Sequence, residues 1–210
     1  MITNEISSAL QSGNARKTKE LVQQAIDEGV SVKEILEEGL LAGMDVIGNK
    51  FRNNEIFIPE VLIAARAMNQ SVELIKPLFE NSGIKSVAKV CLGTVKGDLH
   101  DIGKNLVKLM LEGKGFEVID LGTDVSPEDF VKAAVENDCK IICCSALLTT
   151  TRVVMADVVK AVKEAGLDGK VKVMIGGAAV NADFCDEIGA DYFTEDAASA
   201  AETALGIVNG

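Results

Sequence analysis

The chain has few of the residues from which many binding and catalytic sites are built. Its 210 residues include one histidine, no tryptophan, one tyrosine and three prolines. A single histidine argues against a zinc site built by the protein alone, because such a site needs three or four ligands. The cysteines form no Cys-x-x-Cys pair, so we expect reduced thiols that pack as small buried side chains. A metal or redox role is the alternative for Cys91, Cys139, Cys143, Cys144 and Cys185.

Basic charge is also scarce. There are 21 Lys and Arg residues against 32 Asp and Glu residues, which gives a formal net charge of −11. Nucleic acids and anionic membranes bind surfaces rich in Lys and Arg, so this balance disfavours both as partners. No apolar run approaches the roughly 20 residues that span a bilayer. The N-terminus has no basic segment followed by an apolar one, so we predict no signal peptide and expect a cytoplasmic protein.

The first part of the chain has helical periodicity. Apolar residues recur at spacings of three and four, which predicts helices near residues 3–12, 14–28, 31–50 and 59–80. Ser31 and Glu34 have the form of a capping box, and Pro59 suits the first turn of the last helix. Four antiparallel helices would form a small bundle. The polar segment "ENSGIKS" around Gly83 breaks this pattern, so we predict domains at residues 1–83 and 84–210.

The second part of the chain has a different period. Five short apolar runs, "VAKVCLGT", "FEVIDL", "IICCSAL", "KVMIGG" and "ADYFT", alternate with amphipathic helical stretches. Such alternation predicts an α/β fold of the flavodoxin-like, Rossmann type, with a five-stranded parallel sheet and helices on both faces. Ligands bind at the carboxyl ends of the strands in such sheets. The only histidine, His100, lies just past the first run and is therefore at this edge.

The neighbours of His100 suit a metal ligand. Asp98 and Asp101 flank the histidine, and Gly97 and Gly103 leave room for a close approach. A carboxylate two residues away can accept the Nδ1 proton and leave Nε2 free to bind a metal. One histidine is sufficient when a macrocycle supplies the other ligands.

Four segments together resemble a known family. They are "DLHDIG" (98–103), "SALLTTT" (145–151), "GGAAV" (176–180) and "KFRNNEIFIPEVLIAARAM" (50–68). The first three resemble the Asp-x-His-x-x-Gly, Ser-x-Leu and Gly-Gly loops of domains that bind cobalamin with a histidine in place of its lower base. The fourth is similar to the helical cap of methionine synthase and of corrinoid methyl-carrier proteins. The resemblance covers nearly the whole chain.

The resemblance implies a corrinoid cofactor with His100 as the lower cobalt ligand. Asp98 would bond the imidazole Nδ1, and Thr151 would continue the relay, although the family often has serine there. Gly176 and Gly177 would make room for the nucleotide tail of the cofactor, so we expect valine at either position to weaken binding without unfolding the sheet. The segment around Tyr192 to Asp196 would close that pocket. The residues implied to bind the cofactor are Gly97, Asp98, Leu99, His100, Asp101, Ile102, Gly103, Ser145, Leu147, Thr149, Gly176, Gly177, Ala178, Tyr192 and Asp196.

Residues of the helical part also match positions in the cap of the family. Phe51, Ile58 and Val61 match positions that cover the upper face of the cobalt in the family, and Met68 is a further candidate. The alternative is that these side chains are ordinary core residues of the bundle. Phe51 and Ile58 fall in "FRNNEIFIP", which we interpret as a loop, and a bundle does not need two large apolar groups there.

The implied function is that of a corrinoid methyl carrier. The Co(I) corrinoid would accept a methyl group through a substrate-specific methyltransferase and pass it from methyl-Co(III) to an acceptor methyltransferase that uses tetrahydrofolate or coenzyme M. A reductive activator protein would be a further partner. The chain itself shows no second active site, so we expect no catalysis by the subunit alone. The resemblance does not choose among methanol, methylamine, glycine betaine and aryl methyl ether as donor.

Two other classes remain open. A cobalamin-sensing transcription regulator would need a DNA-binding module, and the first part of the chain is not basic. The small subunit of an adenosylcobalamin mutase shares the histidine motif but is not expected to carry the cap. The upper ligand separates these classes, since the carrier binds methyl or nothing and the others bind adenosyl.

Overall fold

The computed structural model describes residues 1–79 and 86–210. The chain divides into two compact units, Met1–Lys85 with Gly113–Gly115, and Ser86–Glu112 with Phe116–Gly210. The predicted domain boundary between residues 83 and 84 lies outside the described residues.

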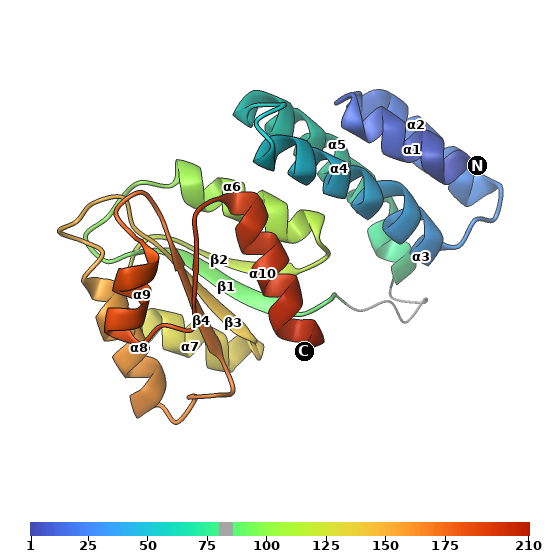
Figure 1. The fold of residues 1–210 in the computed structure, drawn as a ribbon. Helices are drawn as coiled ribbons and strands as arrows, with labels where there is room; N and C mark the ends of the chain where they lie inside the picture. Colours follow the sequence, from blue (N-terminus) through green and yellow to red (C-terminus); the bar gives the residue numbers. More distant parts are fainter. Residues whose placement is uncertain (80–85) are drawn as a thin grey trace. The chain divides into compact units, whose positions relative to one another are not determined.

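The first unit is a bundle of helices (Figure 1). Asn14 and Ser31 cap helix starts, accepting hydrogen bonds from the amides of Lys17 and Glu34 respectively. A capped helix start relieves amides that have no partner within the helix. The elements are α1 (Ile2–Gln11), α2 (Ala15–Asp27), α3 (Val32–Glu34), η1 (Ile35–Leu41), α4 (Ala42–Arg52) and α5 (Ile58–Phe79).

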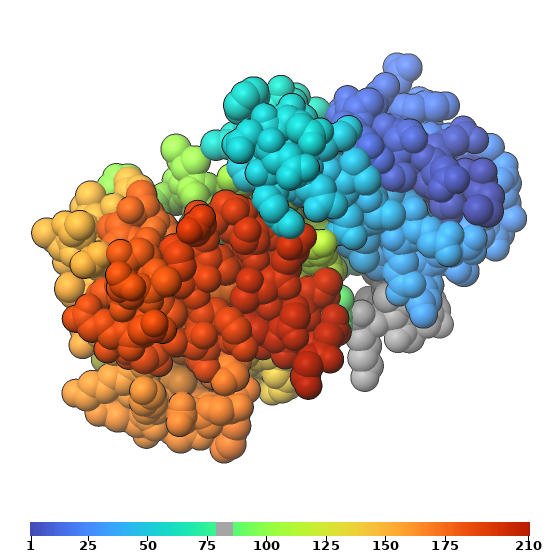
Figure 2. Space-filling model, viewed as in Figure 1, coloured from blue at the N-terminus to red at the C-terminus, as the bar shows by residue number. Residues whose placement is uncertain are grey.

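One predicted helix, residues 31–50, differs in detail from the observed structure. Its residues form a short α-helical turn, the π-helical segment η1 and then α4. Two glycines let α1 pack closely on this run: a Cβ on Gly39 would lie 3.1 Å from Ile6, and one on Gly43 would lie 3.1 Å from Leu10. Ile6, Leu10 and Ile35 are fully buried in the bundle, whose packed side chains appear in blue to cyan in Figure 2.

The second unit confirms the predicted five-stranded sheet. All of its strand pairs are parallel, and the strand order is β2-β1-β3-β4-β5, which is the flavodoxin-like order. The strands are β1 (Lys89–Val95), β2 (Glu117–Val125), β3 (Ile141–Ser145), β4 (Lys172–Gly176) and β5 (Tyr192–Thr194).

Helices cover both faces of this sheet (Figure 1). They are α6 (Ile102–Gly113), α7 (Pro127–Asn137), α8 (Val154–Glu164), α9 (Ala182–Ile188) and α10 (Ala197–Asn209). The helices α7, α8 and α9 pack on one face through a core that includes Phe130, Met155 and Phe184, while α6 and α10 lie on the other face. The order of the strands places the β1–α6, β3–α8 and β4–α9 loops next to one another at the carboxyl edge.

All five cysteines are free and buried, as the packing interpretation predicts. Burial in the sheet raises the pKa of the Cys143 thiol, so the side chain stays neutral. Among the described residues, no group of three or more His, Cys, Asp or Glu side chains is placed to hold a metal ion. None of the described helices is both long enough and apolar enough to cross a membrane.

Candidate functional site

His100 lies in the loop between β1 and α6, at the carboxyl edge of the sheet. Three contacts hold this loop. Thr94 Oγ1 donates to the carbonyl of His100 at 2.8 Å, the amide of Gly97 donates to Asp124 Oδ1 at 2.7 Å, and the amide of Asp124 donates to the carbonyl of Asp98 at 3.1 Å. Gly97 has a φ of +83°, a conformation that glycine adopts without strain. The loop is therefore fixed by β1 and by the end of β2.

Asp98 is the centre of the hydrogen bonding in the site. Its side chain is fully buried. Oδ1 lies 2.7 Å from His100 Nδ1 and accepts from the His100 amide at 3.1 Å. Oδ2 accepts from Thr151 Oγ1 at 2.7 Å and from the Leu147 amide at 2.9 Å. The three residues of the predicted relay, His100, Asp98 and Thr151, are thus joined by direct hydrogen bonds.

These hydrogen bonds decide the charge of Asp98. Burial alone would raise the pKa of the carboxyl, because it disfavours the charged form. Hydrogen bonds from Thr151, His100 and Leu147 outweigh that effect and hold the pKa of Asp98 well below its usual range. The carboxylate is therefore ionised at neutral pH. It is a fixed acceptor for an N–H group at His100 Nδ1.

The imidazole itself is accessible. The His100 side chain is 54% exposed although its partner is buried. Because Nδ1 is engaged by Asp98, Nε2 is the nitrogen that can bind a metal. Large apolar side chains are exposed in the same loop, at the first residue of α6 and in the β3–α8 loop, namely Leu99, Ile102, Leu147, Leu148 and Val153. An accessible imidazole in a rim of exposed apolar groups fits a broad macrocycle with a central metal.

Helix α6 begins two residues after His100 and is anchored to β2. Lys104 is 2% exposed, and its Nζ donates to Asp120 Oδ1 at 2.6 Å. Burial alone would raise the pKa of Asp120, but the hydrogen bond from Lys104 and the amide of Gly122 lower it. Asp101 accepts a hydrogen bond from Asn105 on the exposed side of α6. A Cβ on Gly103 would meet open space, so no close contact within the chain requires this glycine.

The double glycine at the end of β4 lies close to the backbone of neighbouring segments. Gly177 has a φ of +121°, and a Cβ there would collide with the carbonyl of Ala146. A Cβ on Gly176 would lie 3.1 Å from the carbonyl of Thr194. The expectation that Gly177 could become valine without harm to the fold is therefore wrong, because the chain's own backbone occupies the space. Contact of this segment with a cofactor tail stays a prediction.

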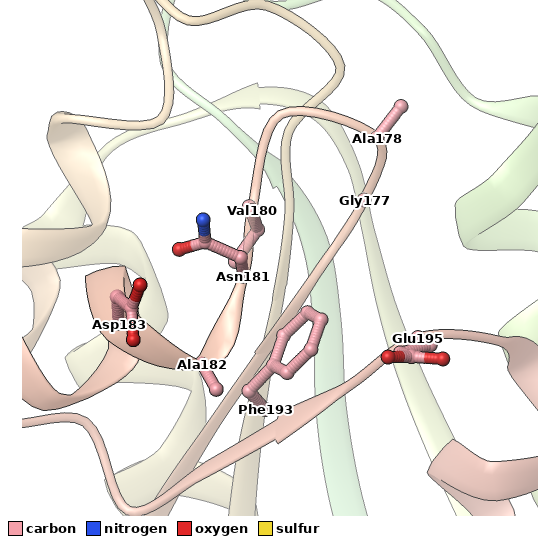
Figure 3. A pocket seen from close by; sticks show the side chains of 8 residues that line it. All are labelled: Gly177, Ala178, Val180, Asn181, Ala182, Asp183, Phe193 and Glu195. Atoms are coloured by element: carbon pink, nitrogen blue, oxygen red, sulfur yellow. The ribbon is translucent and has the colours of Figure 1, made fainter.

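A pocket of about 600 Å³ lies beside this loop (Figure 3). Residues of the β4–α9 loop, the start of α9 and the end of β5 line it: Gly177, Ala178, Val180, Asn181, Ala182, Asp183, Phe193 and Glu195. Tyr192 and Asp196 are not among these lining residues. The Asp196 carboxylate instead caps α10, accepting from the Ser199 amide and hydroxyl at 2.8 Å each.

The other predicted residues of this edge lie at the end of a strand or on exposed loops. Ser145 is the last residue of β3 and is half-buried, and Thr149 is exposed in the turn that follows. Ala178 is exposed beside Gly177. No side-chain hydrogen bond joins Ser145 or Thr149 to the His100–Asp98–Thr151 group, so their part in the site stays a prediction.

The four predicted cap residues divide by exposure. Val61 and Met68 lie within α5 and are buried, which suits packing. Phe51 is half-buried near the end of α4, and Ile58 is 40% exposed at the start of α5. The loop between them is shorter than predicted, since both residues belong to helices. Their action on a cofactor remains a prediction.

Sequence reasoning missed three residues that shape the site. Thr94 and Asp124 hold the histidine loop, and Arg152 joins two loops at the same edge. Thr94 is inside an apolar strand run and Asp124 is distant in sequence, so neither is recognisable as a neighbour of His100. The φ of +59° at Asp124 favours a short polar side chain, which is a signal of local conformation and not of this contact.

Both units match known families. B12 binding domain families match residues 88–205 and residues 2–76. Trimethylamine corrinoid protein 1 of Methanosarcina mazei is 45% identical over 180 residues, which are 85% of this chain and 83% of that protein. A methanol:cobalamin methyltransferase complex of Methanosarcina barkeri contains a chain with a TM-score of 0.89 and 33% identity; the match covers 100% of this chain and 80% of that one. A cobalamin-binding protein of Desulfitobacterium hafniense has a TM-score of 0.81 and 32% identity, with 98% of both chains covered.

Proposed function

We propose a function from one premise, that this chain belongs to the family of B12-binding corrinoid proteins. The proposed function is that of a methyl carrier, which binds a corrinoid through His100 and works with partner methyltransferases. The observation that carries the proposal is the hydrogen-bonded group of His100, Asp98 and Thr151 at the carboxyl edge of the sheet. The bound corrinoid would supply the cobalt that takes up and gives away the methyl group.

The residues of this chain would hold and tune the cofactor. His100 Nε2 would be the lower ligand of the metal, and Asp98 would fix the imidazole by accepting from Nδ1. The ionised Asp98 carboxylate, 2.7 Å from Nδ1, would hold the imidazole in the orientation that presents Nε2 to the metal. Thr151 and the Leu147 amide keep Asp98 ionised and in place.

Partners follow from the relatives. Trimethylamine corrinoid proteins and a methanol:cobalamin methyltransferase complex are among the similar proteins, which supports a methyltransferase partner for this chain. We propose a small methylated compound, a methylated amine or methanol, as the source of the methyl group. A second methyltransferase with tetrahydrofolate or coenzyme M as acceptor, and a reductive activator protein, would complete the system. The net charge of −11 supports partners other than nucleic acid or anionic membrane.

The function is tested by methyl uptake. The protein is loaded with cobalamin, reduced, and mixed with methanol-specific or methylamine-specific methyltransferases and their substrates. Methylation of the cofactor, followed by absorbance, is expected with one of these pairs. Loaded, reduced protein that accepts no methyl group from any of them would contradict the carrier function for these donors.

A further inference from the structure

Arg152 connects two loops of the candidate site. It follows Thr151 in the β3–α8 loop, and its Nη1 donates to the carbonyl of Ala179 in the β4–α9 loop at 2.7 Å. The guanidinium carbon also lies 4.6 Å from the centroid of the Phe184 ring, which is at the start of α9. One side chain therefore makes two contacts across the carboxyl edge of the sheet.

Each of these loops has a part in the proposed cofactor site. The β3–α8 loop supplies the Leu147 amide and the Thr151 hydroxyl to Asp98. The β4–α9 loop contains Gly177 and Ala178, which line the pocket in Figure 3. A change in the spacing of the two loops would change the edge that receives the cofactor.

The loops are fastened at two places. At their base, the Ala146 amide donates to the Gly176 carbonyl at 3.2 Å, and Gly177 lies against the Ala146 carbonyl. Away from the sheet, Arg152 Nη1 donates to the Ala179 carbonyl of the other loop. Within the β4–α9 loop, the Val180 amide donates to the Gly177 carbonyl at 2.9 Å. Val180 is buried in the core and Asn181 caps α9, so Ala178 and Ala179 are the part of this loop that depends on Arg152.

Arginine suits this position for two reasons. Its planar group can donate to a carbonyl while it stacks on an aromatic face, which a lysine ammonium does less well. Arg152 and Ala179 are half-buried and Phe184 is buried, so water competes little for the hydrogen bond. The contact is thus stronger than that of an exposed arginine.

We propose that Arg152 is a positioning residue. Its contacts with Ala179 and Phe184 hold the β4–α9 loop against the β3–α8 loop, and this keeps the carboxyl edge of the sheet in the form that binds the cofactor. This inference rests on the proposed function. Arg152 acts through the loop backbone, and His100 and Asp98 make no hydrogen bond with it. Loss of the Arg152 contacts should therefore loosen the β4–α9 loop and weaken cofactor binding, while the hydrogen bond between His100 and Asp98 stays intact.

The first measurement needs no cofactor. Amide hydrogen exchange is compared between the wild type, Arg152→Met and Lys160→Met, all without corrinoid. Arg152→Met keeps an unbranched apolar stem and removes the donors. Lys160→Met removes one positive charge from the exposed surface of α8 and is the matched control. In Arg152→Met, amides of residues 178–184 should exchange about tenfold faster, since one charge-assisted bond is lost. Exchange of β1 should be unchanged, which shows that the sheet is intact.

The second measurement is the affinity for hydroxocobalamin. Arg152→Met should raise the dissociation constant roughly 5- to 20-fold, Arg152→Lys should raise it less, and Lys160→Met should leave it unchanged. Wild-type amide exchange and wild-type affinity in both Arg152 variants would overturn the proposed positioning role of Arg152. A wild type that fails to bind hydroxocobalamin would refute the proposed function, and the exchange result would then still decide whether Arg152 fastens the loop.

Discussion

Asp98 accepts hydrogen bonds from segments that are far apart in the sequence. His100 is two residues away, while Leu147 and Thr151 are about fifty residues away in the β3–α8 loop. The sequence motif predicted the histidine contact, because a carboxylate at this spacing reaches Nδ1. The resemblance added Thr151. The Leu147 amide was not predicted, since nothing in a sequence reveals where a loop backbone points its amides.

Replacing Asp98 with Asn should destabilise the fold even without cofactor. The neutral amide can accept at one atom only, so a buried donor among Thr151, Leu147 and His100 loses its partner. We expect a loss of about 2–4 kcal/mol in the free energy of unfolding, measured by urea denaturation.

Asp101→Asn is the matched control for Asp98→Asn, because Asp101 is exposed and its carboxylate accepts a hydrogen bond from the exposed Asn105 side chain in the first turn of α6. It should change the free energy of unfolding by less than about 0.5 kcal/mol. Equal stability of Asp98→Asn and the wild type would show that the hydrogen bonds to Asp98 do not support the fold.

At the scale of elements, the spacing of apolar residues and the turn residues predicted most of the observed helices and strands. The five strands and the helices between them follow from alternating apolar runs, because a parallel strand buried on both faces needs a nearly continuous apolar run. The π-helical segment Ile35–Leu41 was not predicted, since its residues have the spacing of an ordinary helix. We predicted Tyr192 for the tail pocket, whereas its neighbour Phe193 lines the cavity beside the β4–α9 loop, because neighbours in a strand face opposite sides.

The glycines of the site should differ in their tolerance of a side chain. Gly177→Ala should cost about 2–4 kcal/mol of folding free energy, because it forces a positive φ on alanine and a clash with the Ala146 carbonyl. Gly103→Ala should be neutral or stabilising by up to about 1 kcal/mol, because Gly103 is in α6 with open space around it. Thermal denaturation measures both changes. Equal losses for the two variants would contradict the geometry at Gly177.

At the scale of the whole molecule, the chain combines a helical unit with a sheet unit, and both match B12 binding domain families. The change of period in the sequence predicted two such parts. The exposed Ile58 and half-buried Phe51 remain the candidates for covering the cofactor. The sequence could not separate the two possible roles of these residues. A side chain that covers a cofactor and a partly buried side chain of the bundle core are both large and apolar.

The cap prediction is tested by replacing Ile58 with Ala. Since Ile58 is 40% exposed, the loss of stability should be below about 1 kcal/mol, less than for a buried isoleucine. If Ile58 shields the methylated cofactor, photolysis of the loaded variant should give a higher net yield, because fewer radical pairs stay caged. Ile75→Ala is the control for packing, since Ile75 belongs to the same helix and is fully buried. Wild-type photolysis in Ile58→Ala would remove this residue from the cap.

The central claim, that His100 binds the cobalt, can be tested directly because the chain has one histidine. Protein without a histidine tag is produced with nitrogen-15 histidine, loaded with cobalamin and reduced to the Co(II) form for electron paramagnetic resonance. We predict a nitrogen splitting that changes from a triplet to a doublet on labelling, and that is lost in His100→Ala. A splitting that stays a triplet in the labelled protein would show that the cofactor's own base is the ligand, and it would contradict the account.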